Sequence, residues 1–427
     1  MNFPFMVRIK QHFETNPIKN IGSAVRQELE RLRLREIIFP GQSVCITAGS
    51  RGIANIQAVL AEVVDVIRGL GAKPFIVPAM GSHGGATAEG QRRVLEHYGI
   101  TEEKVNAPII SSLQVVEVGS TPDGIPVFVD RNAWEADHIV VVNRVKPHTD
   151  FHAEIESGLI KMLAIGLGKQ KGAERYHKAI VRLGHIRVLL DVARLVLDKC
   201  SVAFGLGIVE NQLDETQIIR AAPAHEIEQM ERELLVQAKQ LFPRLPVEEI
   251  DLLIVDNMGK DISGTGMDQN VIGRSTVAYH RPSDKPRIMR IFVRDLTQES
   301  DGNAVGLGNA DFTTKRLVDR IDRQATYMNC LTSNAPEIVR IPPFFDTDQE
   351  AIEAALRTIG DVKPSDARVV HISDTAHLEN MNISLSLLPE VKRMDSISIM
   401  GEPFPMTFDQ KGNLTSSPHQ HNGPESP

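Results

Sequence analysis

The stretch Lys73-Pro-Phe-Ile-Val-Pro78-Ala-Met-Gly81-Ser-His83-Gly-Gly-Ala-Thr87 decides the fold class of this chain. Its first residues are apolar and favour a buried strand over residues 73–77. Three glycines then mark a loop, and a helical pattern follows to about His97. A strand, a glycine-rich loop and a helix in this order predict a βα unit. In such a unit a ligand binds at the carboxyl end of the strand, next to the start of the helix.

The same alternation of strands and helices extends through the first half of the chain. The predicted elements are strands at 42–47, 138–142 and 201–209, helices at about 53–68 and 185–198, and a hairpin at 115–129 around Thr121-Pro-Asp-Gly124. Strands that alternate with helices indicate an α/β fold with a largely parallel, helix-covered sheet.

A break in the pattern predicts two domains. A long helix over residues 224–241 ends at Phe242-Pro-Arg-Leu-Pro246, where proline stops the helix. The second half then repeats the α/β pattern, with strands predicted at 252–255, 290–293, 369–372 and 396–400 and helices at about 311–323 and 349–359. We therefore expect α/β domains at 1–245 and 246–410 with an active site in the cleft between them, and a disordered tail at 411–427.

Composition narrows the class of protein. The 427 residues carry a net charge of −8 without a basic block, so nucleic acid is not an expected partner. No uninterrupted apolar run reaches the length of a membrane span, and the first residues do not have the pattern of a signal peptide. The three cysteines are far apart and form no C-x-x-C pair, which favours reduced thiols in a cytoplasmic protein.

Chemistry-bearing residues gather between residues 143 and 177. Lys161 lies in Leu-Ile-Lys-Met-Leu, where a lysine is either a half-buried helix residue with its ammonium group in water or a desolvated, nucleophilic amine. His148 follows Pro147 after a predicted strand, and His177 comes sixteen residues after Lys161. Lys169 lies in a more polar stretch and is predicted to be at the surface or in contact with a phosphate.

His83 has two interpretations from its surroundings alone. It is either an incidental residue of a glycine-rich turn or a ligand-facing residue in a loop whose glycines let the backbone approach a bound molecule.

The stretch Ser157-Gly158-Leu-Ile-Lys161, together with His177, resembles the cofactor-attachment segment of the nickel-dependent lactate racemase family. In that family the matching lysine holds a nickel-pincer nucleotide covalently, and the matching histidine binds the nickel. The resemblance therefore implies that Lys161 carries this cofactor and that His177 is the metal ligand. It also implies that His83 and His148 are the two catalytic acid–bases.

Further residues match the family less uniformly. Arg51 and Ser50 correspond to an arginine and a threonine near the substrate and the nucleotide, but Ala48 stands where the family has an aspartate. The gap of thirteen residues between His148 and Lys161 is longer than in the family pattern.

A loop in the second half also resembles the family. Residues 259–270 resemble a glycine-rich loop that faces the family's active-site cleft, and in this loop Lys260 or Gln269 would meet a substrate carboxylate. A polar turn without this role is the other interpretation of the same residues.

The activity implied by the resemblance is racemisation or epimerisation of a small 2-hydroxyacid. The α-hydrogen beside a carboxylate is more than about 20 pK units less acidic than imidazolium, a gap of roughly 30 kcal/mol that two histidines cannot bridge. A cofactor that accepts this hydrogen as a hydride, while a histidine takes the hydroxyl proton, avoids the problem.

Two other classes of function remain open from the residues. One is a zinc-dependent hydrolase or lyase that uses His83, His148 and His177. The other is a non-catalytic protein that binds a nucleotide or an anion. The sequence also leaves open whether the chain forms a homo-oligomer.

Overall fold

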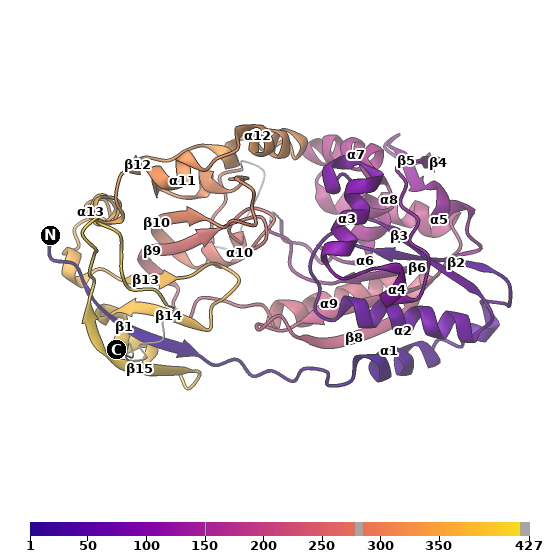
Figure 1. Ribbon diagram of the computed structural model, residues 1–427, viewed down its shortest axis with the longest axis horizontal. Coiled ribbons are helices and arrows are strands. Elements are labelled where there is room, and N and C mark those ends of the chain that lie inside the picture. The colour runs from indigo at the N-terminus through magenta and orange to yellow at the C-terminus, as the bar shows by residue number, and fades with distance from the viewer. Residues whose placement is uncertain (150, 278–284, 419–427) are drawn as a thin grey trace. The chain divides into compact units, whose positions relative to one another are not determined.

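The computed structural model describes residues 1–149, 151–277 and 285–418, and the chain forms two compact units (Figure 1). The N-terminal unit contains Thr15–His148 and His152–Phe242, and the C-terminal unit contains Met1–Glu14, Thr149–Phe151 and Pro243–Pro427. The chain passes from one unit to the other after Phe242, three residues before the predicted boundary. The first fourteen residues lie in the C-terminal unit, whereas the sequence placed them in the N-terminal domain.

The N-terminal unit is an α/β structure. Its strands are β2 (Ser43–Ala48), β3 (Lys73–Pro78), β4 (Val115–Ser120), β5 (Pro126–Asp130), β6 (His138–Arg144), β7 (Val202–Glu210) and β8 (Thr216–Pro223). Its helices are α1 (Ile21–Glu30), α2 (Ile56–Gly69), α3 (Ala88–His97), α4 (Glu102–Val105), α5 (Arg131–Glu135), α6 (Leu159–Lys161), α7 (Lys169–Leu183), α8 (His185–Lys199) and α9 (Ile227–Gln240).

The central sheet of this unit has the strand order β3-β2-β6-β7-β8. The first four strands are parallel and β8 is antiparallel to β7, so the predicted largely parallel sheet is confirmed. The predicted hairpin forms β4 and β5, which make a separate two-stranded sheet. The carboxyl ends of β3, β2, β6 and β7 therefore lie at one edge of the central sheet.

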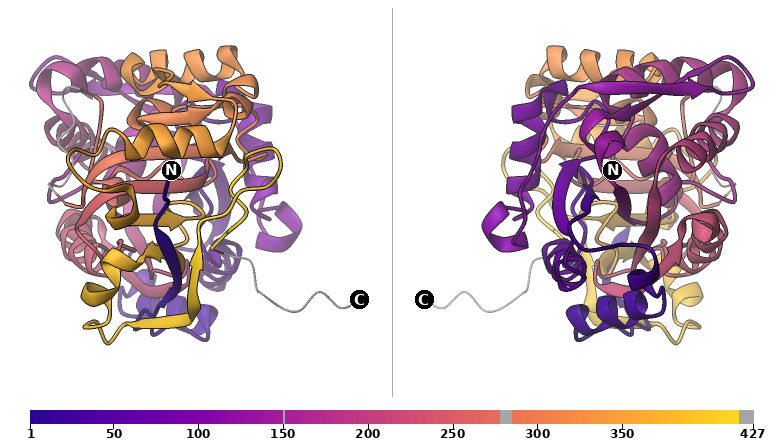
Figure 2. Two further views of the ribbon diagram at one scale, coloured as in Figure 1. Left: turned by 90° about the vertical axis from the view of Figure 1, so that its left-hand side faces the viewer. Right: turned by 90° about the vertical axis from the view of Figure 1, so that its right-hand side faces the viewer.

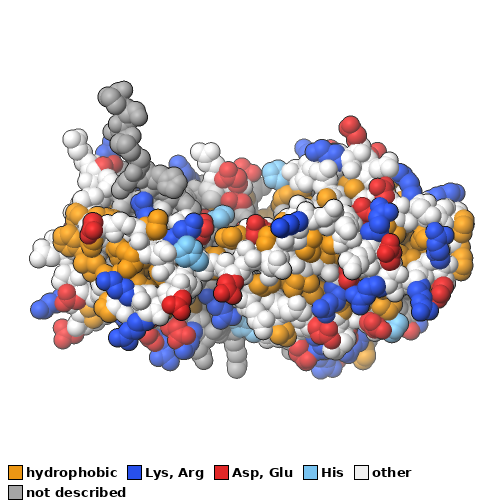
Figure 3. Space-filling model, turned by 90° about the horizontal axis from the view of Figure 1, so that it is seen from below, with side chains coloured by type: hydrophobic (Ala, Val, Ile, Leu, Met, Phe, Trp, Pro, Cys, Tyr) orange, Lys and Arg blue, Asp and Glu red, His pale blue; other side chains and the backbone are white. Residues whose placement is uncertain are grey.

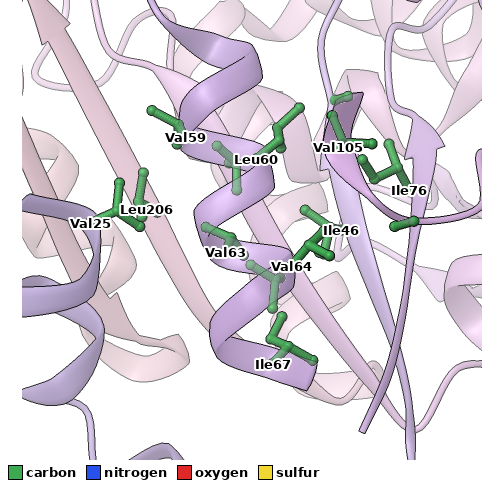
Figure 4. Packing of buried hydrophobic residues seen from close by; sticks show 14 of the residues in the cluster. Val25, Ile46, Val59, Leu60, Val63, Val64, Ile67, Ile76, Val105 and Leu206 are labelled. Atoms are coloured by element: carbon green, nitrogen blue, oxygen red, sulfur yellow. The ribbon is translucent and has the colours of Figure 1, made fainter. Parts of the chain in front are cut away.

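Both faces of this sheet are covered by helices. On one face, α2 buries an apolar stripe that includes Val59, Val63 and Ile67 against strand residues such as Ile46 (Figure 4). Each of these side chains is fully removed from water, and burial of this kind contributes about 1.5–3 kcal/mol per large side chain. The spacing of three and four residues along α2 is what aims the stripe at the sheet.

The other face of the sheet packs closely against α6 and α9 because β7 has glycine there. A Cβ added at Gly205 would lie 3.0 Å from Leu159 of α6 and 2.9 Å from Ile227 of α9. A Cβ at Gly207 would lie 2.5 Å from Leu234. These two glycines therefore allow the helices to pack closely on β7.

The C-terminal unit is also an α/β structure. Its strands are β1 (Phe5–Gln11), β9 (Glu249–Met258), β10 (Arg287–Leu296), β11 (Phe312–Thr314), β12 (Phe344–Phe345), β13 (Val369–Ile372), β14 (Asn380–Ser384) and β15 (Ile397–Pro405). Its helices are α10 (Gln269–Ile272), α11 (Lys315–Asp319), α12 (Arg323–Thr332), α13 (Asp348–Leu356) and α14 (Leu388–Val391).

These eight strands form one sheet in the order β12-β11-β10-β9-β13-β14-β1-β15. The strands from β12 to β13 are parallel, and β14, β1 and β15 are antiparallel to their neighbours. Figure 2 shows β1, in indigo, among the yellow strands of the chain's other end. This pairing explains why the first fourteen residues leave the N-terminal unit: the backbone of β1 is hydrogen-bonded on both sides to strands of the C-terminal unit.

One predicted helix of this unit is wrong in its first part. The sequence predicted a helix at about 311–323, but Phe312–Thr314 is the strand β11 and only Lys315–Asp319 is helical. The three strand residues are buried, and β11 pairs with β10 and β12, so sheet pairing decided the conformation. Thr314 then caps the short helix by accepting a hydrogen bond from Leu317 N.

The start of the predicted disordered tail is held in the structure. Leu414 is buried, its N–H donates to Asp348 over 2.9 Å, and its carbonyl accepts from Arg294 over 2.9 Å. Ser417 accepts a hydrogen bond from Arg8 of β1 at its carbonyl oxygen. Residues 411–418 therefore do not form a free tail, and residues 419–427 lie outside the described residues.

Charges are mixed on the face drawn in Figure 3, where lysine and arginine side chains alternate with aspartate and glutamate. This face carries no extended area of one sign. Within the described ranges, no helix has the length and apolar character needed to cross a membrane.

Candidate functional site

The carboxyl ends of β2 and β3 bring the first two predicted site residues together. Ser50 follows β2 and His83 follows β3, and the Ser50 hydroxyl and His83 Nδ1 are hydrogen-bonded. The His83 ring is exposed and Ser50 is half-buried. A histidine fixed at one ring nitrogen by a hydroxyl presents its other nitrogen to a ligand, which is the arrangement that proton transfer needs. Arg51 follows Ser50 and is exposed.

The family's aspartate position is filled by an apolar residue here. Ala48 is the last residue of β2 and belongs to the apolar core. Its carbonyl oxygen accepts a hydrogen bond from Ala79 N over 2.8 Å. The methyl group in this place supplies no charge to the site.

The loop that carries His83 is held in place by hydrogen bonds from Gln91, which is completely buried. The Gln91 amide donates to Gly81 O over 2.9 Å and to His83 O over 3.4 Å. Its oxygen accepts from Lys169 over 3.4 Å. The position of the histidine loop therefore depends on a polar residue of α3.

The position of Lys169 differs from the one predicted from the sequence. The sequence indicated a surface lysine or a phosphate contact, but Lys169 is fully buried and forms an ion pair of 3.0 Å with Asp130. Its ammonium group also donates to Pro78 O at the end of β3. The backbone of Lys169, at the start of α7, has a φ of +53°. These partners allow the Lys169 side chain to be buried, because a buried ammonium group is tolerated only when it is paired.

The long gap between His148 and Lys161 is closed by a short bridge. Lys146 and Ser157 pair in antiparallel fashion, so the residues between them form a loop whose ends meet. The buried Glu156 accepts from His148 N over 2.7 Å and from Ala153 N over 3.0 Å. Lys239 of α9 pairs with Glu156 over 2.5 Å. Glu156 therefore fixes the backbone at His148.

The His148 ring lies close to a second histidine. Its centroid is 6.1 Å from that of His185, the first residue of α8. The sequence did not single out His185, because nothing near it in the chain indicates a site.

Lys161 ends a helix of only three residues, α6, and is followed by a π-helix at Met162–Gly166. π-helical turns are rare and often occur at functional sites. The side chain of Lys161 is half-buried. Gly158 begins this segment, and its carbonyl oxygen accepts from Asn143 of β6 over 2.9 Å.

The π-helix contacts both strand ends that carry Ser50 and His83. A Cβ added at Gly49 would lie 3.2 Å from Met162, and one added at Gly81 would lie 3.1 Å from Ile165. The N–H of Gly81 also donates to Gly166 O over 3.4 Å. The segment of Lys161 is therefore packed against the segments of Ser50 and His83 at the carboxyl edge of the sheet.

His177 lies in α7 and is half-buried. The preceding residue, Tyr176, is buried and accepts a hydrogen bond from Phe128 N over 2.9 Å. Burial raises the pKa of Tyr176 to about 12, so its hydroxyl stays protonated. This bond anchors α7 on β5 and fixes the helix that carries His177.

The remaining predicted site residues, Lys260 and Gln269, belong to the C-terminal unit. Lys260 lies in the loop after β9, at the carboxyl end of a parallel strand, and Gln269 begins the helix that follows this loop. The Lys260 ammonium group donates to Gly264 O over 2.5 Å, and the N–H of Lys260 donates to Ser300 over 3.0 Å. Lys260 thus bonds to its own loop.

Gln269 is the first residue of α10 and is 1% exposed. Neither its amide nitrogen nor its amide oxygen has a hydrogen-bond partner among the described residues. Ser373, which follows the neighbouring strand β13, also has a hydroxyl without a partner in this part of the structure. Buried polar groups are normally satisfied, so this edge of the C-terminal unit has bonding capacity for a ligand or for water.

The described residues contain no group of three or more His, Cys, Asp or Glu side chains that could hold a metal ion. The trio of His83, His148 and His177 required by the zinc alternative is therefore not assembled in this structure.

Several residues of the site were not singled out by the sequence. Glu231 is the clearest case: it lies on the buried face of α9, and its carboxylate bonds to the first turn of α6. The sequence could have indicated Glu231, because it is a charged residue at an apolar position of an amphipathic helix. Glu156, Gln91 and Asp130 gave no comparable signal, because their partners are distant in the chain.

Comparison with known proteins agrees with this architecture. Residues 6–185 match the family model of the lactate racemase N-terminal domain. A solved structure, the lactate racemase apoprotein from Thermoanaerobacterium thermosaccharolyticum, is similar over 92% of this chain and 96% of its own, with a TM-score of 0.50 and 13% sequence identity. None of the curated proteins matches the sequence.

The fold is thus that of a two-unit α/β protein of the lactate racemase type. Residues 6–185, less than half of the chain, are similar to the N-terminal domain of the lactate racemase family.

Proposed function

We propose that this protein is a racemase or epimerase of a small 2-hydroxyacid that works with a nickel-pincer nucleotide held covalently by Lys161. The observation that carries the proposal is the packing of the Lys161 segment against the strand ends that bear Ser50 and His83. The family match of residues 6–185 supports the reaction class.

The residues present suit such a cofactor. Lys161 offers a primary amine in a half-buried place, and an amine is a nucleophile suited to covalent attachment. His177 offers an imidazole, a ligand that nickel accepts. When bound, the cofactor would supply a reversible acceptor for the α-hydrogen of the substrate.

The protein's own groups would handle the substrate and its proton. His83, oriented through Nδ1 by Ser50, would take the hydroxyl proton of one enantiomer and return it. His148, whose backbone is fixed by Glu156, would serve the other enantiomer. The guanidinium of Arg51 would bind the substrate carboxylate through paired hydrogen bonds.

We further propose that Gln269 binds a polar group of the substrate. Its amide is buried and has no partner among the described residues, so a bound hydroxyl or carboxylate oxygen would satisfy it. Lys260 is the second candidate of this loop, although its ammonium group bonds to Gly264.

The decisive experiment is to express the protein together with cofactor-assembly enzymes and nickel and to measure its intact mass. We expect a nucleotide-sized adduct on Lys161 and about one nickel per chain. Lys161→Ala should lose the adduct and all activity on 2-hydroxyacids.

Lys178→Ala is the matched control, because Lys178 is an exposed lysine of α7 paired with Glu174. It should keep both the adduct and the activity. An unmodified Lys161 in cells where a known racemase is loaded, or full activity of Lys161→Ala, would overturn the proposal.

A further inference from the structure

Glu231 has a role that the proposed reaction does not use. It lies on α9, is fully buried, and directs its carboxylate at the first turn of α6. One carboxylate oxygen accepts from Ile160 N over 2.7 Å, and the carboxylate also accepts from Leu159 N. These are the first two N–H groups of α6, which have no partner inside the helix.

The glycine before Lys161 is explained by the same carboxylate. A Cβ added at Gly158 would lie 2.4 Å from Glu231 Oε1 and 2.5 Å from Glu231 Cδ, so the carboxylate would have to move away from its present position. The backbone of Gly158 has a φ of −172°, which is open to any residue. Glycine at residue 158 therefore allows Glu231 to approach this closely.

The short helix cannot hold its own position. α6 is three residues long, and an isolated helical turn of this length is unstable because nucleation is unfavourable. Its first turn is fixed from outside: Glu231 binds the N–H groups, and Asn143 of β6 binds the carbonyl of Gly158. A negative carboxylate at the N-terminus of a helix also interacts favourably with its dipole.

We propose that Glu231 is a positioning residue that fixes the first turn of α6 and thereby sets where the Lys161 amine is presented for cofactor attachment. This inference rests on the proposed function of Lys161. It assigns the role to the contact between α9 and the backbone of Leu159 and Ile160, and Glu231 itself lies outside the matched residues 6–185.

The first test measures the lysine itself, in the protein without cofactor. The rate at which an amine-selective acylating reagent labels Lys161 is followed by peptide mass spectrometry across a pH series, with exposed Lys178 in the same digest as the internal standard. Glu231→Ala should change the Lys161 rate by about tenfold, the factor for roughly one lost hydrogen bond to a charged group. The Lys178 rate should stay unchanged.

Glu231→Gln is the conservative variant. Its amide oxygen still accepts a hydrogen bond from the turn, so its Lys161 rate should lie between the rates of the wild type and Glu231→Ala. A role limited to stability would lower the unfolding midpoint of the variants without altering the Lys161 rate of folded protein, and that result would overturn the proposal.

The second test is a double-mutant cycle on cofactor loading. Gly158→Ala and Glu231→Ala should each lower the fraction of Lys161 that carries the adduct in cells with the assembly enzymes. The double variant should be no worse than Glu231→Ala, because the clash at residue 158 disappears with the carboxylate. Additive losses, or loading of folded Glu231→Ala equal to the wild type, would contradict the proposal.

The proposed cofactor on Lys161 and the proposed role of Glu231 can be refuted independently of each other. If the wild type is not loaded while a control racemase is, the cofactor proposal fails, and the labelling of Lys161 still decides the role of Glu231.

Discussion

Each unit buries carboxylates that hold neighbouring segments, and the surroundings shift the pKa values of Glu231 and Asp256 in opposite directions. In the N-terminal unit, Glu231 holds the turn before Lys161 through backbone N–H groups, and burial raises its pKa to about 7. In the C-terminal unit, burial alone would raise the pKa of Asp256, but His371 and Arg294 outweigh it and lower this pKa below its ordinary value.

The difference shows that the partners, and not burial itself, decide the charge of an inner carboxylate. Asp256 accepts from His371 over 2.7 Å and from Arg294 over 2.5 Å, and Arg294 also bonds to Asp348 and to Leu414 O. This charged network fastens the C-terminal segment to the sheet. Glu231 has no cation among its described hydrogen-bond partners, so holding it ionised costs stability.

The largest effect on stability is expected when another buried carboxylate, Asp130, loses its neighbouring cation and so comes to resemble Glu231. Lys169→Met removes the cation beside Asp130 and leaves a buried, unpaired carboxylate. The expected loss is about 3–5 kcal/mol of unfolding free energy at neutral pH. Urea unfolding followed by the fluorescence of Trp134, the chain's single tryptophan and part of α5 in the same unit, measures it.

Lys178→Met is the control for this measurement, because Lys178 is exposed, and it should change stability by less than about 0.5 kcal/mol. Equal stabilities for the two variants would show that the buried pair contributes nothing.

The pH dependence of the N-terminal unit should come partly from Glu231. Its folded pKa is about 7, above the value of about 4.3 in an unfolded chain. Its contribution is thus fully present below about pH 4.3 and falls by about 3–4 kcal/mol as the pH rises to 7. Glu231→Gln should remove this decline, as measured by Trp134 fluorescence in urea at a series of pH values. A variant whose stability declines as steeply as the wild type's between these pH values would refute the assignment.

Asp256 should give the opposite dependence in the C-terminal unit. Because its folded pKa lies below the unfolded value of about 3.9, its contribution is present above that value and is lost as the pH falls through the folded pKa. Asp256→Asn should cost about 1–3 kcal/mol at pH 7 and much less at pH 3. Hydrogen exchange in β9 reports on this unit, and a cost that is the same at both pH values would contradict the prediction.

The smallest change in stability is expected at Gln269, where a substitution should weaken substrate binding without lowering the stability of the fold. Gln269→Leu removes a buried amide without a partner among the described residues, so stability should be unchanged or rise by up to about 1 kcal/mol. Under the proposed function, the KM for the 2-hydroxyacid should rise. Thermal unfolding and steady-state kinetics of the loaded enzyme test both parts, and a clear loss of stability would mean that the amide is satisfied in the free protein.

Local sequence patterns predicted much of the architecture. The apolar runs of β2, β3, β6 and β7, separated by helical patterns such as the apolar stripe of α2, indicated the parallel sheet, because strands buried on both faces are apolar throughout. The glycine-rich loop after β3 placed His83 at the carboxyl edge of that sheet.

Contacts between distant residues could not be predicted in this way. β1 reads as an ordinary N-terminal strand, yet it belongs to the sheet of the C-terminal unit because its hydrogen-bond partners are β14 and β15. Residues 312–314 continue a helical pattern, but pairing on both sides makes them a strand.

The sequence by itself determined the strands, the helices and the residues that resemble a cofactor-binding segment, since these depend on neighbours in the chain. Only the tertiary structure decided that Lys169 is buried against Asp130 and that Glu231 lies against the turn of Lys161. The physical reason is that the state of a charged side chain depends on the dielectric and on the partners around it, and folding brings these partners from positions far away in the sequence.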